Sequence, residues 1–224
     1  MTGIQKKQRL LTMIFGAFAI FFTGYPHVWS IYQPYVMEQA GWSQGQASMC
    51  FYLALSTFVF GNIVGGRMQN RFKEKTIVWI GGGIFAAGIR ASAFLIVPTP
   101  IPMYLSYGVM QGFGQGMIYT VILATVQRWF PDRTGFASGV VVTANGLCGF
   151  FLAPLSRKLL EAEGVQKTFL IIGAAIAVSW ILCGIFFQAP DKSLVNAGGS
   201  AAKSGTSEMR QYTCLLYTSP SPRD

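Results

Sequence analysis

Residues 111–135 read QGFGQGMIYTVILATVQRWFPDRTG, and this stretch decides the fold. It is an uncharged, glycine-rich run that ends in a short basic segment. Gln111, Gln115 and Tyr119 recur every fourth residue, so a helix would place their polar tips on one face. Such a face is stable beside water or a bound solute and costly against hydrocarbon. We therefore expect this helix to border a polar cavity inside a bundle of membrane helices.

Small residues indicate where the helices of such a bundle approach one another. Gly112 and Gly116 lie four residues apart, a spacing that lets a second helix pack closely where lipid provides no hydrophobic drive. Two similar stripes occur elsewhere: Gly61 and Gly65 with Asn62 between them, and Gly135, Gly139 and Gly146. We expect each stripe to face a neighbouring helix, and Asn62 to bond across its contact.

The composition places these helices in a membrane. Of the 224 residues, 52% are hydrophobic and 11% are charged, against roughly 25% charged residues in soluble domains. Uncharged runs of more than 20 residues recur along the chain, each long enough to hold a membrane span. We predict an all-α membrane protein with a six-helix transmembrane domain over residues 1–190. Its helices are expected near residues 10–35, 45–66, 76–97, 103–127, 135–156 and 168–188.

The basic residues indicate the orientation. The net charge is +9, and most Lys and Arg residues fall in loops expected on one side of the membrane. Cytoplasmic loops are rich in Lys and Arg, so both termini are predicted to be cytoplasmic in a multi-pass protein of the cell membrane. The basic residues are thus expected to set the orientation of the protein in the lipid bilayer, and no nucleic-acid partner is expected.

The first predicted helix carries many polar-tipped side chains. Pro26 lacks a backbone donor and should kink it, which membrane helices tolerate where neighbours or a cavity satisfy the freed carbonyl. One of two faces should meet the cavity: Tyr25, Trp29 and Gln33, or Thr23, His27 and Ser30. The alternative is an aromatic belt at the membrane interface.

Arg90 is the single permanent charge predicted deep inside a span. It lies seven residues before Val97, about 10 Å below the outer helix end. Three roles are open: snorkelling to the interface, an interhelical contact, or attraction of a substrate. No Asp or Glu falls within any predicted span, which favours an anionic substrate over a cationic one.

Other functional classes fit the sequence poorly. One His and no intramembrane acid cannot supply the paired acids or triad of a membrane enzyme, so none is expected. The four cysteines lack metal or redox spacing, and neither a metal nor a cofactor is expected. Residues 191–210 form a polar segment expected to be a cytoplasmic linker. Residues 211–224 resemble translated sequencing-adapter ends and are expected to be an artefactual or disordered tail.

The loop after the second helix resembles the loop motif of the major facilitator superfamily. Gly66, Arg71 and Lys75 match that motif, whereas Asn70 stands at its aspartate and Lys73 at its second glycine. A closer resemblance is to the oxalate/formate antiporter family, carried by GYPHVWSIYQP, AGWSQGQAS, RWFPDRTGFASG and FLAP. The chain is therefore identified as similar to the N-terminal half of such a transporter.

This resemblance implies two six-helix halves around a central site that opens alternately to either side. The second half, which should hold the main basic groups for substrate, is an expected partner. The expected activity is exchange of small carboxylates, with a carrier for another solute or a non-transporting receptor as alternatives. The candidate cavity residues are His27, Trp29, Arg90, Gln111, Gln115 and Tyr119. The candidate gating and topology residues are Gly66, Asn70, Arg71, Lys75, Arg128, Asp132 and Arg133.

Overall fold

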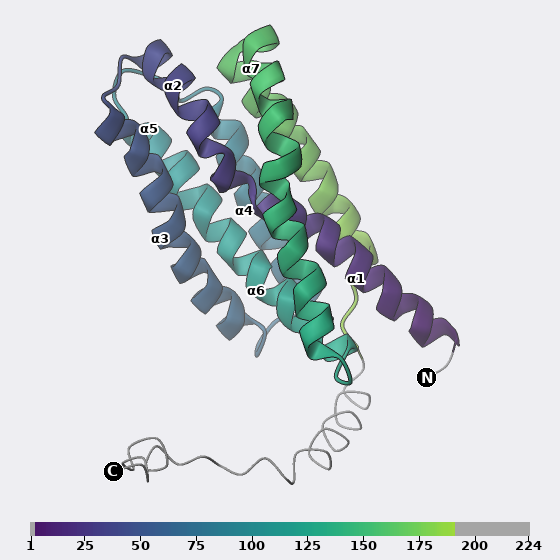
Figure 1. The fold of residues 1–224 in the computed structure, drawn as a ribbon. Helices are drawn as coiled ribbons and strands as arrows, with labels where there is room; N and C mark the ends of the chain where they lie inside the picture. The colour runs from purple at the N-terminus through teal and green to yellow at the C-terminus, as the bar shows by residue number, and fades with distance from the viewer. Residues whose placement is uncertain (1–2, 191–224) are drawn as a thin grey trace, which may run out of the picture.

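The computed structural model describes residues 3–190, with side chains from Lys7 onward, and this part is helical without strands. The predicted linker at 191–210 and tail at 211–224 lie outside the described residues. In chain order the elements are α1 (Gly3–Thr23), the 3₁₀ turn η1 (Tyr25–Val28), α2 (Trp29–Ala40), α3 (Gln44–Met68), α4 (Glu74–Ser92), α5 (Ile101–Met103), the π-helical segment η2 (Tyr104–Gln111), α6 (Gly112–Trp129) and α7 (Thr134–Phe186). They form one elongated bundle, with the α3–α4 and α6–α7 connections at the same end as the N-terminus (Figure 1).

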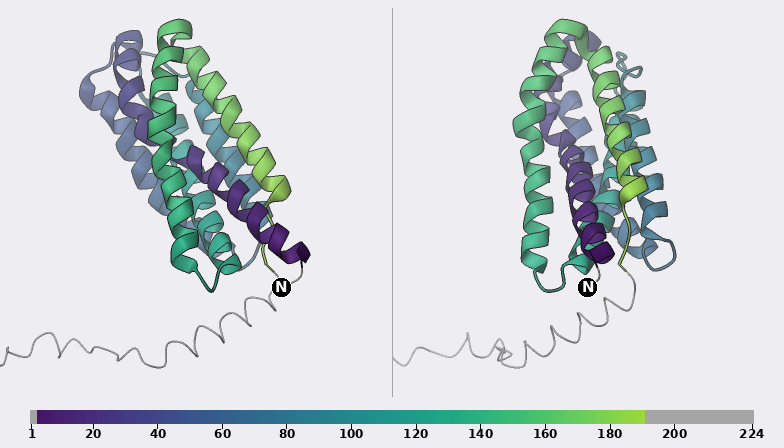
Figure 2. Two further views of the ribbon diagram at one scale, coloured as in Figure 1. Left: turned by 45° about the vertical axis from the view of Figure 1, so that its right-hand side comes forward. Right: turned by 90° about the vertical axis from the view of Figure 1, so that its right-hand side faces the viewer.

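The prediction of an all-α membrane protein is confirmed for the described residues, but its count of six membrane helices is not. Within residues 3–190, four stretches are long and apolar enough to cross a membrane: Lys7–Ala40, Gln44–Met68, Ile101–Trp129 and Thr134–Phe186. The 19-residue α4 is not among them, because charged residues at both its ends lower its hydropathy. The last two predicted helices both lie in α7, which folds back on itself as two helical legs (Figure 2).

The connection predicted at residues 157–167 is wrong, because most of it is helical. The sequence RKLLEAE from 157 to 163 consists of strong helix formers, and Leu160 is buried against the bundle. The chain leaves the helical conformation at Gly164, with φ 76° and ψ 175°. That conformation is essentially restricted to glycine, which explains why α7 reverses there.

The first predicted helix is also modified. It is divided into α1, η1 and α2, and it continues past residue 35 to Ala40. It ends at Gly41, whose left-handed φ of 69° suits a glycine after a helix. Ser43 then caps α3 through a reciprocal pair of bonds with Gln46.

The contact between α3 and α6 is the closest in the bundle. A Cβ atom at Gly116 would overlap the Phe58 carbonyl oxygen, and one at Gly65 would lie 2.6 Å from the Met117 oxygen. Thr120 Oγ1 donates a hydrogen bond across this contact to Asn62 Oδ1. The predicted roles of these glycines and of Asn62 in helix packing are thus confirmed, and the packing positions α6 beside the break in α1.

Candidate functional site

The break between α1 and α2 is where the candidate residues meet. In a 3₁₀ turn the Thr23 carbonyl would accept from residue 26, but Pro26 has no N–H. The N–H of His27 donates instead to Gly24 O at 3.0 Å. Gln115 Nε2, from α6, donates to Thr23 O at 2.5 Å. A side-chain amide therefore replaces the backbone bond that the proline removes.

A second amide reaches the same break from α7. Asn145 Nδ2 donates to Thr23 Oγ1 at 2.8 Å, and that hydroxyl donates to Ile20 O at 2.6 Å. A Cβ atom at Gly24 would lie 2.5 Å from the Cys148 Cβ, so α7 packs directly on the break. Gln111 Nε2 completes the network by donating to Gln115 Oε1 at 3.0 Å. Uncharged groups from two other helices thus hold the irregular backbone.

Aromatic rings surround this network on the side of α2. The Trp29 ring packs on Tyr107 with centroids 4.5 Å apart, and its Nε1 donates to Ala47 O at 3.0 Å. The Tyr32 hydroxyl donates to Ser156 Oγ at 3.1 Å, and its ring lies 4.9 Å from that of Phe169. Both rings are buried. Through these contacts Trp29 joins α2 to α3 and η2, and Tyr32 joins α2 to α7.

A small pocket opens beside Trp29, between the break and α3. Its volume is ≈ 220 Å³, and its lining consists of Pro26, His27, Trp29, Ser30, Gln33, Ser48, Phe51 and Tyr52. His27 and Ser30 are exposed, and Gln33 Nε2 donates to Ser48 Oγ at 3.1 Å. The prediction offered two alternative faces for the cavity. Residues of both line this pocket, because the 3₁₀ turn changes the helical register between them.

The π-helical segment η2 lies directly before α6. Thr57 Oγ1, from α3, donates to Gly108 O at 2.7 Å, which places a side chain against the wider helical turn. The hydroxyl of Tyr107 and Oε1 of Gln111 are buried and make no hydrogen bond with the described residues. Irregular π turns occur frequently at functional sites, and nothing in the amino-acid pattern predicted this one.

Two candidate residues lie away from these groups. Tyr119 is half-buried and packs edge-to-face on Phe58 of α3, with centroids 5.6 Å apart. Arg90 is exposed on α4, and its side chain lies close to Gly173 on the second leg of α7. The structure thus brings His27 with Trp29, and Gln111 with Gln115, but places Arg90 and Tyr119 elsewhere.

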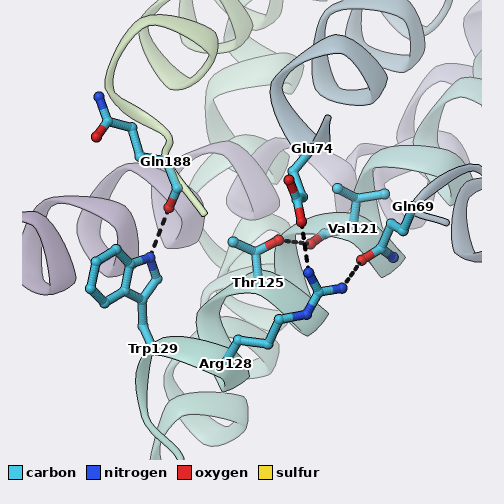
Figure 3. Close-up of polar contacts among 7 residues, drawn as sticks. All are labelled: Gln69, Glu74, Val121, Thr125, Arg128, Trp129 and Gln188. Carbon is cyan, nitrogen blue, oxygen red and sulfur yellow. Dashed lines mark hydrogen bonds and ion pairs between the residues drawn. The ribbon is translucent and has the colours of Figure 1, made fainter. Parts of the chain in front are cut away.

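The candidate gating residues gather at the end of the bundle that holds the N-terminus. Arg128 Nη1 forms an ion pair with Glu74 Oε1 at 2.7 Å, and its Nη2 donates to Gln69 Oε1 at 2.5 Å (Figure 3). The adjacent Trp129 Nε1 donates to Gln188 O at 2.7 Å. The end of α6 is thereby joined to the α3–α4 connection and to the residues that follow α7. We call Gln69, Glu74 and Arg128 the end clamp.

The other residues of this region differ in their contacts. Lys75 Nζ donates to Ile185 O at 3.1 Å, and Asp132 forms an ion pair with Arg9 at 2.8 Å. Gly66 lies beside Thr120, Arg133 precedes α7, and Asn70 and Arg71 are exposed. The prediction did not include Gln69 and Glu74, since both resemble ordinary solvated loop residues in the sequence.

Comparison with known proteins identifies the family. The family model of the Major Facilitator Superfamily matches residues 11–218. The chain belongs to the major facilitator superfamily. It is therefore a multi-pass membrane protein of a family of transporters.

Individual members of the superfamily match at moderate identity. The protein named Uncharacterized MFS-type transporter YhjX of Escherichia coli (strain K12) is 27% identical over 203 residues, or 90% of this chain and 50% of the relative. The Oxalate:formate antiporter of Oxalobacter formigenes is 26% identical over 168 residues, covering 75% of this chain and 40% of the relative. Monocarboxylate transporter 11 of Homo sapiens is 31% identical over 132 residues, covering 59% of this chain and 27% of the relative. The chain thus spans at most about half the length of these curated relatives.

Proposed function

We propose that this chain is the N-terminal half of a secondary transporter that exchanges small carboxylates by alternating access. Two of the relatives are named as an oxalate:formate antiporter and a monocarboxylate transporter. The observation that supports the same substrate class on this chain is the ≈ 220 Å³ pocket beside Trp29. Its volume is below the roughly 300 Å³ at which pockets for drug-sized ligands begin.

The chemistry of this pocket suits an anion that needs neutral hydrogen-bond donors. Its lining offers the imidazole of His27, the hydroxyl of Ser30 and the amide of Gln33, and it includes no carboxylate. A carboxylate lining would repel an anion at this distance, whereas neutral donors bind it without the cost of burying a second charge. We assign His27 and Trp29 to the substrate path on this basis.

The proposed architecture completes the six crossings. α4 and the two legs of α7 would each cross the membrane, with both termini in the cytoplasm and a second six-helix half facing the pocket. The break in α1 and the π segment η2 would be the deformable points, because their backbone bonds already depend on side chains. Gln111 and Gln115 would then act by holding these points in place, and the end clamp would hold the inner end closed in one state.

Counterflow with the full-length protein tests this function. Proteoliposomes preloaded with unlabelled oxalate or formate should take up the labelled carboxylate faster than empty vesicles do. Gln33→Leu should lower this uptake severalfold, because it removes a donor from the pocket, whereas the exposed Lys158→Gln should leave uptake unchanged. Binding without flux would instead identify a receptor, and equal uptake by empty and loaded vesicles would contradict exchange.

A further inference from the structure

A second pocket lies at the other end of α3, in the connection to α4. Its volume is ≈ 470 Å³, and it is lined by Val64, Arg67, Met68, Asn70, Arg71 and Phe72. The end of α3 continues into a tight turn in which the N–H groups of Arg71 and Phe72 both donate to Met68 O, at 3.0 and 2.9 Å. The backbone therefore holds two arginines and a phenylalanine around one concave surface. We call this the basic pocket.

The arginines of the basic pocket differ from Arg128 and Lys75, two other basic residues at this end of the bundle. Arg128 and Lys75 bind groups within the bundle, at Glu74 and at Ile185 O. Arg67 and Arg71 are exposed, and they form no ion pair or side-chain hydrogen bond with residues 7–190. Glu74, the nearest carboxylate in sequence, is already paired with Arg128 at 2.7 Å. Two positive charges thus line a pocket that contains no carboxylate.

The remaining lining of this pocket is apolar. Val64 and Met68 are half-buried, and Phe72 is 49% exposed. Phe72 stands where an apolar membrane-spanning stretch, Gln44–Met68, has just ended. A large exposed ring next to guanidinium groups at the end of such a stretch is typical of the boundary between lipid headgroups and acyl chains, where aromatic side chains are enriched.

We propose that the basic pocket binds the phosphate of an anionic phospholipid. Guanidinium groups bind phosphate oxygens in paired hydrogen bonds, so Arg67 and Arg71 would hold the headgroup. The start of an acyl chain would lie over Phe72 and Met68. Basic residues directly beyond a membrane helix are attracted to anionic lipids of the cytoplasmic leaflet, where the predicted orientation places this connection. The neutral Asn70 is compatible with such a ligand, whereas a carboxylate at its position would repel it.

Native mass spectrometry of the full-length protein in detergent tests this site. Phosphatidylglycerol, phosphatidylcholine and inorganic phosphate would be titrated separately against the wild type. The double variant Arg67→Gln/Arg71→Gln should bind phosphatidylglycerol about 10- to 30-fold more weakly, the effect expected for two arginines near a lipid phosphate. Asn70→Asp should weaken binding in the same direction. The matched control Arg157→Gln/Lys158→Gln changes two exposed basic residues near the turn of α7 and should bind as the wild type does.

The outcomes separate the sources of the phosphate. Preference for phosphatidylglycerol that is lost in both pocket variants supports the proposal. Equal binding of phosphatidylcholine, or displacement of the lipid by inorganic phosphate at similar concentration, would overturn it in favour of an apolar or a free-phosphate site. If the double variant does not fold, Phe72→Ser and Asn70→Asp provide the same test. Unchanged phosphatidylglycerol binding in both would also overturn the proposal, whatever the transport assay shows.

Discussion

Two stripes of glycine at the same spacing have different surroundings in this bundle. On the α3–α6 contact, Cβ atoms at Gly61, Gly65 and Gly116 would collide with the backbone of the opposite helix. On the first leg of α7, Cβ atoms at Gly135, Gly139 and Gly146 would have nothing within 4 Å among the described residues. One stripe is therefore filled within this part of the chain, and the other is left open.

The difference shows that a small-residue stripe predicts a close contact but not its partner. Gly112 and Gly116 of α6 pack against α3, although α4, α5 and η2 separate the two helices in the chain. The open stripe of α7 borders a shallow, mostly apolar pocket lined by Phe136, Gly139 and Leu147 among others. Under the proposed architecture, the second half of the transporter would cover this face. The two stripes should therefore respond differently to the same substitution.

The largest expected effect comes from Gly116→Val. The added side chain would overlap the Phe58 carbonyl, and Asn62 N would lie 2.8 Å from its Cβ, so backbone would have to move. Overpacking typically costs about 1–3 kcal/mol, and this site should lie at or above the upper end because rigid backbone must shift. We expect a melting temperature many degrees below that of the wild type, or no recoverable folded protein, measured by thermal unfolding in detergent.

Gly139→Val is the matched control, because it makes the same chemical change on a helix with open space. Its unfolding should resemble that of the wild type. Transport should nevertheless fall if the second half packs on this stripe. Equal destabilisation by the two variants would contradict the comparison, since it would mean that valine is simply unfavourable in these helices.

A smaller effect is expected from Gln115→Leu. Gln115 lies next to Gly116, but this substitution removes hydrogen bonds and adds no side chain to a close helix contact. Thr23 O would lose its donor at 2.5 Å, and Gln111 Nε2 would lose its acceptor at 3.0 Å. Hydrogen bonds between membrane helices contribute about 1 kcal/mol. We expect modest destabilisation and a larger loss of transport, because the break in α1 would no longer be held. Thermal unfolding and counterflow on one preparation measure both.

Gln33→Leu is the control for this amide, because its bond to Ser48 at 3.1 Å does not involve irregular backbone. It also removes one bond between helices, so it should destabilise the protein by no more than about 1 kcal/mol, and it should lower transport because a pocket donor is lost. A Gln115→Leu protein with wild-type stability would show that the freed carbonyl finds another donor, and that close packing alone holds the break.

Much of the fold could be predicted from hydropathy and turn residues. Uncharged runs located the spans because charged side chains are costly in hydrocarbon. These spans could be predicted as helices because a helix satisfies its own backbone hydrogen bonds in lipid. Three departures could not be predicted. The helix continues past Ser156 because Leu160 finds a buried position, the π segment η2 depends on contacts from Thr57, and α7 reverses at Gly164. The first two depend on tertiary contacts and the third on a backbone conformation open to glycine, and helix periodicity encodes neither.

The candidate site was predictable as a set of residue types but not as an arrangement. Gln115 was expected to face a cavity, and it binds the Thr23 carbonyl instead. Pro26 predicted a kink but not which carbonyl would lose its partner, because that depends on whether the next turn is 3₁₀ or α. The partners of Arg128 were missed because Gln69 and Glu74 lie 59 and 54 residues away in sequence.

The third prediction concerns the end clamp, which joins the ends of α3 and α6 to the start of α4. Arg128→Lys keeps the charge but cannot bind Glu74 and Gln69 together with the geometry of a guanidinium group. Because the pair is partly exposed, the stability loss should stay below about 1 kcal/mol. If the clamp holds one end closed, counterflow should slow by a larger factor than this small loss of stability can explain. Arg157→Lys is the control, and equal transport in both variants would contradict a gating role.

The smallest expected effect is at Glu163, which lies at the turn between the two legs of α7 and, under the proposed architecture, outside the membrane. Its carboxylate accepts a hydrogen bond from Lys167 Nζ at 2.7 Å, and this bond together with the positive charge lowers the pKa of Glu163. A lowered pKa adds stability above the ordinary pKa of the carboxyl group, and this stability is lost as the pH falls through the lowered value. Both side chains are exposed, so Glu163→Gln should shift the melting temperature at pH 7 by no more than about 1 °C. Any difference from the wild type should vanish in acid. A shift of several degrees at neutral pH would show that the turn at Gly164 is held by charge rather than by the conformation of the glycine.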